Sequence, residues 1–242
     1  MSNEANHPVR TTEKSLRIIE EVKRLNGARI HELADELSMT KGAIHNHLST
    51  LYEHGYVVKQ GPEYHLSLQF LTLGGHTRSQ HPLYAQGRSE MKLLANDTGM
   101  LTNLMVEENG MGVYLFQFRG EYAVNLDTHV GYRIRLHNIG AGKAILAYLP
   151  REYVTEIIDK WGLPKETENT ITSKERLFEE LDQIRQQGYA TDLEERTEGL
   201  CCIAAPIRSD NEVLGSISVS APTSRLRENE FDEEIIGQVK ST

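Results

Sequence analysis

The sequence predicts an α+β protein in two parts: a small N-terminal domain of short helices and a β-hairpin, and a larger domain in which helices pack on an antiparallel sheet. Apolar residues recur at helical spacing through residues 13–55, whereas from Leu101 onward strand-like runs alternate with helices. The charge is also uneven. Residues 1–60 hold 8 Lys and Arg against 8 Asp and Glu, so the net charge of −9 comes entirely from the rest of the chain.

The composition excludes several classes of protein. Hydrophobic residues make up 38% and charged residues 25% of the chain, which is ordinary globular usage. No apolar run approaches the roughly 18 residues of a membrane span, and the polar first residues do not form a signal peptide. The adjacent Cys201 and Cys202 cannot build a disulfide framework. We therefore expect a cytoplasmic protein without a membrane partner.

Three amphipathic helices are predicted at the N-terminus. The first covers 13–25 and stops at Asn26-Gly27, and the second covers 29–39. Thr40 is a suitable N-cap for the third, 41–55. A tight connection between the second and third helices is typical of a helix-turn-helix.

A β-hairpin is predicted directly after the third helix, with strands at 56–59 and 64–68 and Gly61-Pro62 at its tip. Such a hairpin makes the domain a winged helix. The alternative is a plain three-helix module for protein contacts.

The solvent-facing side of the third helix carries small and polar residues, which allow close approach to DNA. An Asn can bind adenine, a Lys can reach guanine or phosphate, and free N–H groups at the helix start can hold a phosphate. His45 and His47, two positions apart on a helix, face different ways and predict no metal site. The candidate DNA-binding residues are Thr40, Lys41, Gly42, Ala43, His45, Asn46, Ser49 and Gln60.

The chain after the wing is divided into a linker and a second domain. Gly74-Gly75 ends an apolar run, and we expect a short connecting helix or turn over 69–81. The DNA-binding domain would then span 10–68, the linker 69–81 and the second domain 82–242. Within the second domain we expect helices at 83–96, 140–149, 152–161 and 173–188, and strands at 101–108, 112–118, 121–128, 201–209 and 213–222. Asn109-Gly110 and Asp210-Asn211 are the expected hairpin turns.

Known catalytic motifs are missing from the second domain. Residues 140–143, Gly-Ala-Gly-Lys, resemble a phosphate loop, but Ala144 replaces the Mg²⁺-binding Ser or Thr and His137 replaces the first Gly. Cys201 and Cys202 would face opposite sides of a strand, which disfavours a redox pair. We expect no catalytic residue, metal or cofactor, although a small-molecule pocket is allowed.

Three segments resemble the IclR-type transcriptional regulators: 29–57, 131–150 and 188–226. The likeness follows the family's order from about residue 12 to 232. It implies a GAF-like effector domain, homodimers or homotetramers, a palindromic double-stranded DNA operator, and control by a small metabolite such as an organic, sugar or aromatic acid.

The resemblance also implies an effector pocket, lined by Leu126, Ile134, Gly140, Ala141, Asp192, Leu200, Cys202, Ser218 and Ser220. N–H groups at the start of a helix favour a carboxylate, and residues at i and i+2 share a strand face. Two departures stand out. Arg135 replaces a common Pro and would add a positive charge near the pocket mouth, and the chain ends at 238–242 where the family continues with a longer helix.

The predicted function is therefore metabolite-modulated, sequence-specific DNA binding. Two alternatives stay open: an enzyme or redox protein that uses the N-terminal domain for docking, and a constitutive DNA-binding protein with a vestigial pocket. Dimer and tetramer, and activator and repressor, fit the residues equally well.

Overall fold

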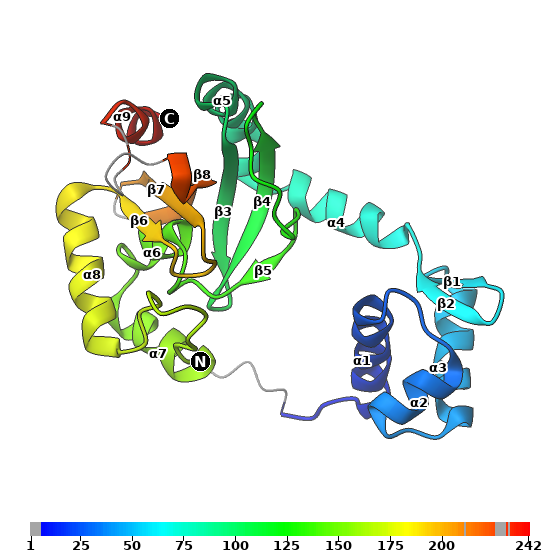
Figure 1. Cartoon of the computed structure of the whole chain (residues 1–242). Helices are drawn as coiled ribbons and strands as arrows, with labels where there is room; N and C mark the ends of the chain where they lie inside the picture. The colour runs from blue at the N-terminus through cyan, green and yellow to red at the C-terminus, as the bar shows by residue number, and fades with distance from the viewer. Residues whose placement is uncertain (1–5, 211, 226–230, 232) are drawn as a thin grey trace. The chain divides into compact units, whose positions relative to one another are not determined.

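The computed structural model describes residues 6–210, 212–225, 231 and 233–242, and the chain divides into two compact units (Figure 1). The first unit ends at Thr77 and the second begins at Arg78. Over the described residues, no helix has both the length and the apolar character needed to cross a membrane. The predicted α+β class is confirmed by helices and antiparallel strands in both units.

The first unit is a winged helix-turn-helix. Its elements are α1 (Arg10–Arg24), α2 (Ile30–Leu37), α3 (Lys41–Glu53) and the antiparallel hairpin of β1 (Val57–Gln60) and β2 (Glu63–Leu66). The fully buried side chains of Ile18, Leu33 and Ile44 bring the three helices together. Tyr64 in the wing exchanges two backbone hydrogen bonds with Ala28, of 2.8 and 3.0 Å. The wing is therefore part of the domain, and the alternative of a plain three-helix module is wrong.

A single helix, α4 (Gln69–Ser79), follows the wing. Gly74 and Gly75, which end the apolar run in the sequence, lie inside it. Each glycine costs a helix only about 1 kcal/mol relative to alanine, so the pair does not stop it. Near the start of α4 the side chains of Leu68 and Leu71 are exposed.

The described strands of the second unit form one antiparallel sheet in the order β5-β4-β3-β8-β7-β6. At the turn between β3 and β4, Asn109 and Gly110 have φ angles of 56° and 82°. Positive φ at both positions is the geometry for which Asn-Gly is favoured, so this hairpin prediction is confirmed. The strands are β3 (Leu101–Glu108), β4 (Met111–Arg119), β5 (Arg133–Ile134), β6 (Ala190–Leu193), β7 (Leu200–Ser209) and β8 (Glu212–Pro222).

Helices cover both faces of this sheet. On one face, Met105 and Ala204 pack in one hydrophobic cluster with α6 (Gly140–Leu146), α7 (Arg151–Trp161) and α8 (Lys174–Gln187). On the other face, Leu104, Ile203 and Val219 pack with α5 (Pro82–Thr98) and α9 (Glu233–Ser241). A short 3₁₀ turn, Thr223–Arg225, follows β8. Residues that alternate along one strand therefore belong to two different cores.

The strand expected at 121–128 is wrong. This segment contains turns and irregular backbone, held by side chains: Arg119 donates to Asn125 Oδ1 at 2.8 Å, and Gln117 donates to Thr128 Oγ1 at 3.0 Å. The backbone N–H groups of Tyr122 and Ala123 donate to the Gly99 and Gly120 carbonyls at 2.7 and 3.3 Å, in place of a strand ladder.

Other boundaries also differ from the sequence-based expectation. The helix expected at 140–149 ends at Leu146, before Pro150. The sequence analysis missed β5, β6 and α9, because β5 has only two residues and β6 buries Asp192, which breaks an apolar strand pattern. Asn211, expected in the last hairpin turn, lies outside the described residues.

Candidate functional site

The third helix of the first unit presents a polar face away from its core. The helix begins after Thr40, whose Oγ1 accepts a hydrogen bond from the Ala43 N–H at 3.2 Å, so the predicted N-cap is confirmed. Ile44 and Leu48 are fully buried. A Cβ added at Gly42 would meet no atom within 4 Å, so the start of the helix is open to a close partner.

The structure places the predicted DNA-binding residues on the surface. Ala43 is half-buried, and Gln60 lies at the exposed end of β1. His47 is different from its neighbours on α3, because its Nδ1 lies 2.8 Å from Ser15 Oγ and joins α3 to α1. The exposed residues of the set are Thr40, Lys41, Gly42, His45, Asn46, Ser49 and Gln60.

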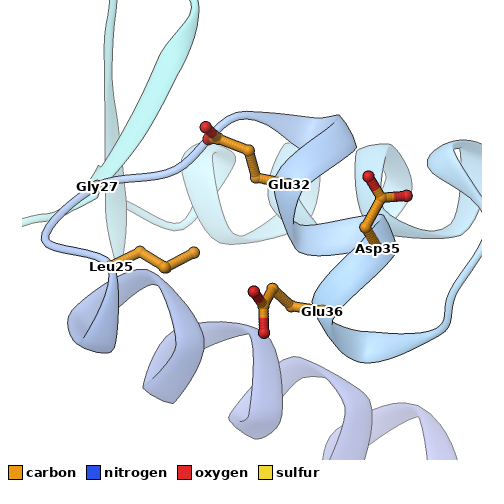
Figure 2. Close-up of a pocket in the computed structure, with 5 residues that line it drawn as sticks. All are labelled: Leu25, Gly27, Glu32, Asp35 and Glu36. Atoms are coloured by element: carbon orange, nitrogen blue, oxygen red, sulfur yellow. The ribbon is translucent and has the colours of Figure 1, made fainter.

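A separate pocket of about 350 Å³ in this unit is acidic (Figure 2). Three carboxylates of α2 surround it, together with Leu25 and Gly27 from the end of α1 and the following turn. Glu32 accepts a hydrogen bond from the Arg29 N–H at 2.6 Å, and Glu36 pairs with Arg24 at 2.9 Å. Glu32 thus caps α2 and Glu36 joins it to α1, and the charge of the three carboxylates opposes contact with DNA phosphates here. The three carboxylates are those of Glu32, Asp35 and Glu36.

The core of the predicted effector site is assembled by strand register. Asp192 on β6 lies opposite Cys202 on β7, and Cys202 lies opposite Ser220 on β8. Directly paired residues point to the same side of a sheet, so these three form one buried row. Gly140 closes the row from α6, because a Cβ there would lie 3.4 Å from Cys202 Sγ and 3.5 Å from Asp192 N.

The other predicted effector residues surround this row to different degrees. Ser218 lies two positions from Ser220 and is buried on the same side of β8. The carbonyl of Ala141 accepts a hydrogen bond from Ser216 Oγ at 2.9 Å, which fixes α6 on the sheet. Leu200 is buried at the start of β7, and Ile134 packs at β5 in the cluster of Ala141. Leu126 is half-buried in the irregular 121–128 segment.

Sequence analysis missed a polar network that extends the site across β3 and β4. Asn103 Nδ2 donates to Ser218 Oγ at 3.4 Å, and Gln117 Nε2 donates to Asn103 Oδ1 at 2.9 Å and to Thr128 Oγ1 at 3.0 Å. An Asn in the middle of an apolar strand was the available signal. The network provides amide and hydroxyl groups beside the row.

Burial controls the charge of the site. Burial, together with the charge of the neighbouring Glu195 carboxylate, raises the pKa of Asp192 to about 7. Burial likewise raises the pKa of both cysteine thiols to about 12, so neither is a thiolate at neutral pH. Cys201 packs in the core of the opposite sheet face, as predicted for adjacent strand residues. The two thiols therefore lie on opposite faces of the sheet, which disfavours a redox pair.

Lys143, the lysine of the phosphate-loop-like segment, has a structural role. Its fully buried ammonium group pairs with Glu180 at 3.0 Å and with Glu195. It is therefore not available to a phosphate. Arg135, expected near the pocket mouth, donates from its Nε to the Trp161 carbonyl at 3.2 Å. Within the described ranges, no three His, Cys, Asp or Glu side chains gather as a metal site.

Two family models match the chain. The model described as "Bacterial transcriptional regulator IclR C-terminal" matches residues 76–242, and the "IclR helix-turn-helix domain" model matches residues 11–61. The chain belongs to the IclR family. An IclR-family protein of this architecture is a transcriptional regulator with a DNA-binding helix-turn-helix and a C-terminal effector domain.

Individual IclR relatives agree with this assignment. The probable HTH-type transcriptional regulator ArcR of Halobacterium salinarum is 35% identical over 226 residues, which are 91% of this chain and 86% of that protein. The crystal structure of the Thermotoga maritima IclR protein superimposes with a TM-score of 0.78 at 24% identity, covering 97% of this chain and 96% of that one.

A third relative carries a ligand. It is an IclR homologue from Microbacterium hydrocarbonoxydans complexed with 4-hydroxybenzoate, with a TM-score of 0.79 at 19% identity, covering 96% of this chain and 95% of that one. At this identity, as with the Thermotoga protein, the likeness shows the shared fold alone.

Proposed function

We propose that this protein binds a palindromic operator in the cytoplasm as a homodimer or homotetramer, and that a small organic or sugar acid bound in the second unit changes operator occupancy. The observation that carries the effector part is the buried row of Asp192, Cys202 and Ser220 on the α6 face of the sheet. A few polar groups that converge on one side of an otherwise apolar core are typical of a small-molecule site, because they orient a polar ligand.

The DNA-binding part rests on α3. In a helix-turn-helix the second helix of the motif enters the major groove with its first residues against the base edges. The open Gly42 and the exposed Lys41 and Asn46 occupy those first turns. In this proposal residues 10–68 bind DNA, 69–81 link the domains, and 82–242 bind the effector and the other protomers.

The effector needs to bind only modestly more tightly to one of two states of the protein, operator-bound or operator-free, than to the other. A coupling free energy of about 1–3 kcal/mol changes operator affinity by about 5- to 150-fold. A protein with this fold is complexed with 4-hydroxybenzoate, and we propose a ligand of the same class, a carboxylic acid, for this chain. The proposal assigns Leu126, Ile134, Gly140, Ala141, Asp192, Leu200, Cys202, Ser218 and Ser220 to this site.

The test is sequencing of the DNA that co-purifies with the protein from its own cells. The control is the double variant Lys41→Ala, Asn46→Ala, in which both changes are on the surface and are expected to alter stability by no more than about 0.5 kcal/mol each. We expect a small set of inverted repeats that the double variant loses. Equal enrichment by both proteins would overturn the assignment of α3 as the DNA-reading helix.

A further inference from the structure

Arg196 is held loosely although its side chain is only 14% exposed. Its Nη2 lies 3.5 Å from Asp127 Oδ1, and its Cζ lies 5.8 Å from the centroid of the Tyr132 ring. Charged hydrogen bonds are ordinarily about 2.7–2.9 Å long. Arg135 and Arg185 in the same unit donate to backbone carbonyls at 3.2 and 2.7 Å. Among the described residues, Arg196 therefore lacks a comparably close partner.

The position of Arg196 connects two walls of the candidate effector site. It follows Asp192 of the buried row by four residues, and its partner Asp127 lies between Leu126 and Thr128 in the irregular segment. Thr128, the residue after Asp127, accepts a hydrogen bond from Gln117 Nε2 at 3.0 Å, so the Arg196–Asp127 contact adjoins the polar network of the candidate site.

Lys143, another cation of this region, is already engaged. It is fully buried and paired with Glu180 and Glu195. Asp127, in contrast, is 79% exposed, so water competes for its carboxylate at the long 3.5 Å contact with Arg196. A ligand carboxylate can therefore displace Asp127 from Arg196 at little cost.

We propose that Arg196 binds the carboxylate of the effector, and that Asp127 occupies Arg196 only while the site is empty. This inference rests on the proposed function and deepens it, because it names the ligand group and the residue that recognises it. The planar guanidinium binds a carboxylate through two parallel hydrogen bonds, which fixes the orientation of the ligand. Loss of the Asp127 contact frees the 121–128 segment from the residues that follow β6.

The experiment measures ligand affinity by calorimetry on the full-length chain. The probes are pyruvate, gluconate and 4-hydroxybenzoate, each paired with its neutral amide: pyruvamide, gluconamide and 4-hydroxybenzamide. We expect at least one acid to bind and its amide not to bind. Arg196→Gln should weaken the binding of that acid by about tenfold or more. The affinity of Arg196→Lys should lie between those of Arg196→Gln and the wild type. Asp127→Asn should strengthen the binding of that acid by about two- to fivefold, because the carboxylate that competes for Arg196 is removed.

Arg176→Gln is the matched control, because Arg176 pairs with Glu179 on the surface of α8 and is 59% exposed. It should leave the affinity unchanged. The inference would be overturned if Arg196→Gln bound the acid with wild-type affinity, or if the acid and its amide bound equally well. It would also be overturned if none of the three acids bound.

Operator binding with the same probes separates this inference from the proposed function. If an acid binds through Arg196 but leaves operator affinity unchanged, the inference stands and effector control fails. If operator affinity responds to an acid equally in the wild type and in Arg196→Gln, effector control stands and the inference is wrong.

Discussion

Lys143 has no exposed surface, and its ammonium group is held between the carboxylates of Glu180 and Glu195. Removing one member of a buried ion cluster leaves the remaining charges without a partner. We therefore expect Lys143→Met to lower the free energy of unfolding by about 3–5 kcal/mol, measured by urea denaturation. The control is Lys165→Met, which breaks the exposed pair with Glu168 and should cost less than about 1 kcal/mol. Equal losses would contradict a structural role for the buried cluster.

Asp192 makes stability depend on pH. Burial, reinforced by the charge of Glu195, raises its pKa from 3.8 to about 7. The folded chain therefore holds this proton more tightly than the unfolded chain. The resulting stability is complete below about pH 4, and it is lost as the pH rises to about 7. The change in pKa corresponds to at most about 4 kcal/mol.

The variant Asp192→Asn tests this dependence, because it cannot ionise and keeps the Oδ1 that accepts from the Glu195 N–H at 2.7 Å. We expect the variant to gain stability relative to the wild type as the pH rises from 4 to 8, measured by urea denaturation at each pH. Parallel stability curves for the two proteins would show that Asp192 titrates alike in the folded and unfolded chains.

At the scale of the element, a substitution at the start of α3 distinguishes a helix that contacts DNA from an ordinary exposed helix. A Cβ at Gly42 has open space around it, and alanine favours a helix by about 1 kcal/mol over glycine. Gly42→Ala should therefore raise the thermal stability of the first unit and at the same time weaken operator binding, since the added methyl group stands between the helix and the bases. Fluorescence anisotropy and thermal melting measure the two effects.

Gly74→Ala is the matched control, because Gly74 lies inside α4 and a Cβ there also meets nothing within 4 Å. It should stabilise the chain similarly and leave operator affinity unchanged. A Gly42→Ala protein that is stabilised with unaltered DNA affinity would remove the start of α3 from the interface.

The elements that the sequence analysis predicted well carry local signals. The helices α1, α3 and α8 have apolar residues at helical spacing, and two of them have an N-cap whose side chain accepts a backbone hydrogen bond. The β3–β4 turn follows from Asn109-Gly110. The 121–128 segment carries a strand-like composition, yet Gln117 and Arg119 on β4 hold it by side-chain hydrogen bonds.

The site could be predicted only in part, because it depends on register between distant strands. Asn103 and Ser218 are 115 residues apart in the chain and lie directly opposite each other on β3 and β8. Local sequence patterns contain no information on that pairing. Asp192 and Cys202 were named from the family resemblance, whereas Asn103, Gln117 and Arg196 emerged only when the sheet and the 121–128 segment were placed together.

At the scale of the whole molecule, the chain itself carries a net charge of −9, although its proposed partner, DNA, is also negatively charged. Because residues 1–60 have equal numbers of acidic and basic side chains, we expect affinity to come from a few local contacts and, in the proposed dimer, from two DNA-binding domains on one operator. The logarithm of affinity should fall with the logarithm of salt concentration about twice as steeply on a full palindrome as on one half-site. Equal salt slopes on the half-site and the palindrome would contradict the binding of two equivalent DNA-binding domains to one operator.

Lys41 is exposed at the first position of α3, and we expect it to neutralise one phosphate in each half-site. Each lost phosphate contact reduces the salt slope by about 0.9, so Lys41→Ala should reduce it by about 0.9 on a half-site and about 1.8 on the palindrome. The matched control, Lys165→Ala, removes a half-exposed lysine of the second unit and should change neither slope. If Lys41→Ala instead loses affinity at an unchanged slope, Lys41 binds a base edge, because a base contact releases no counterion.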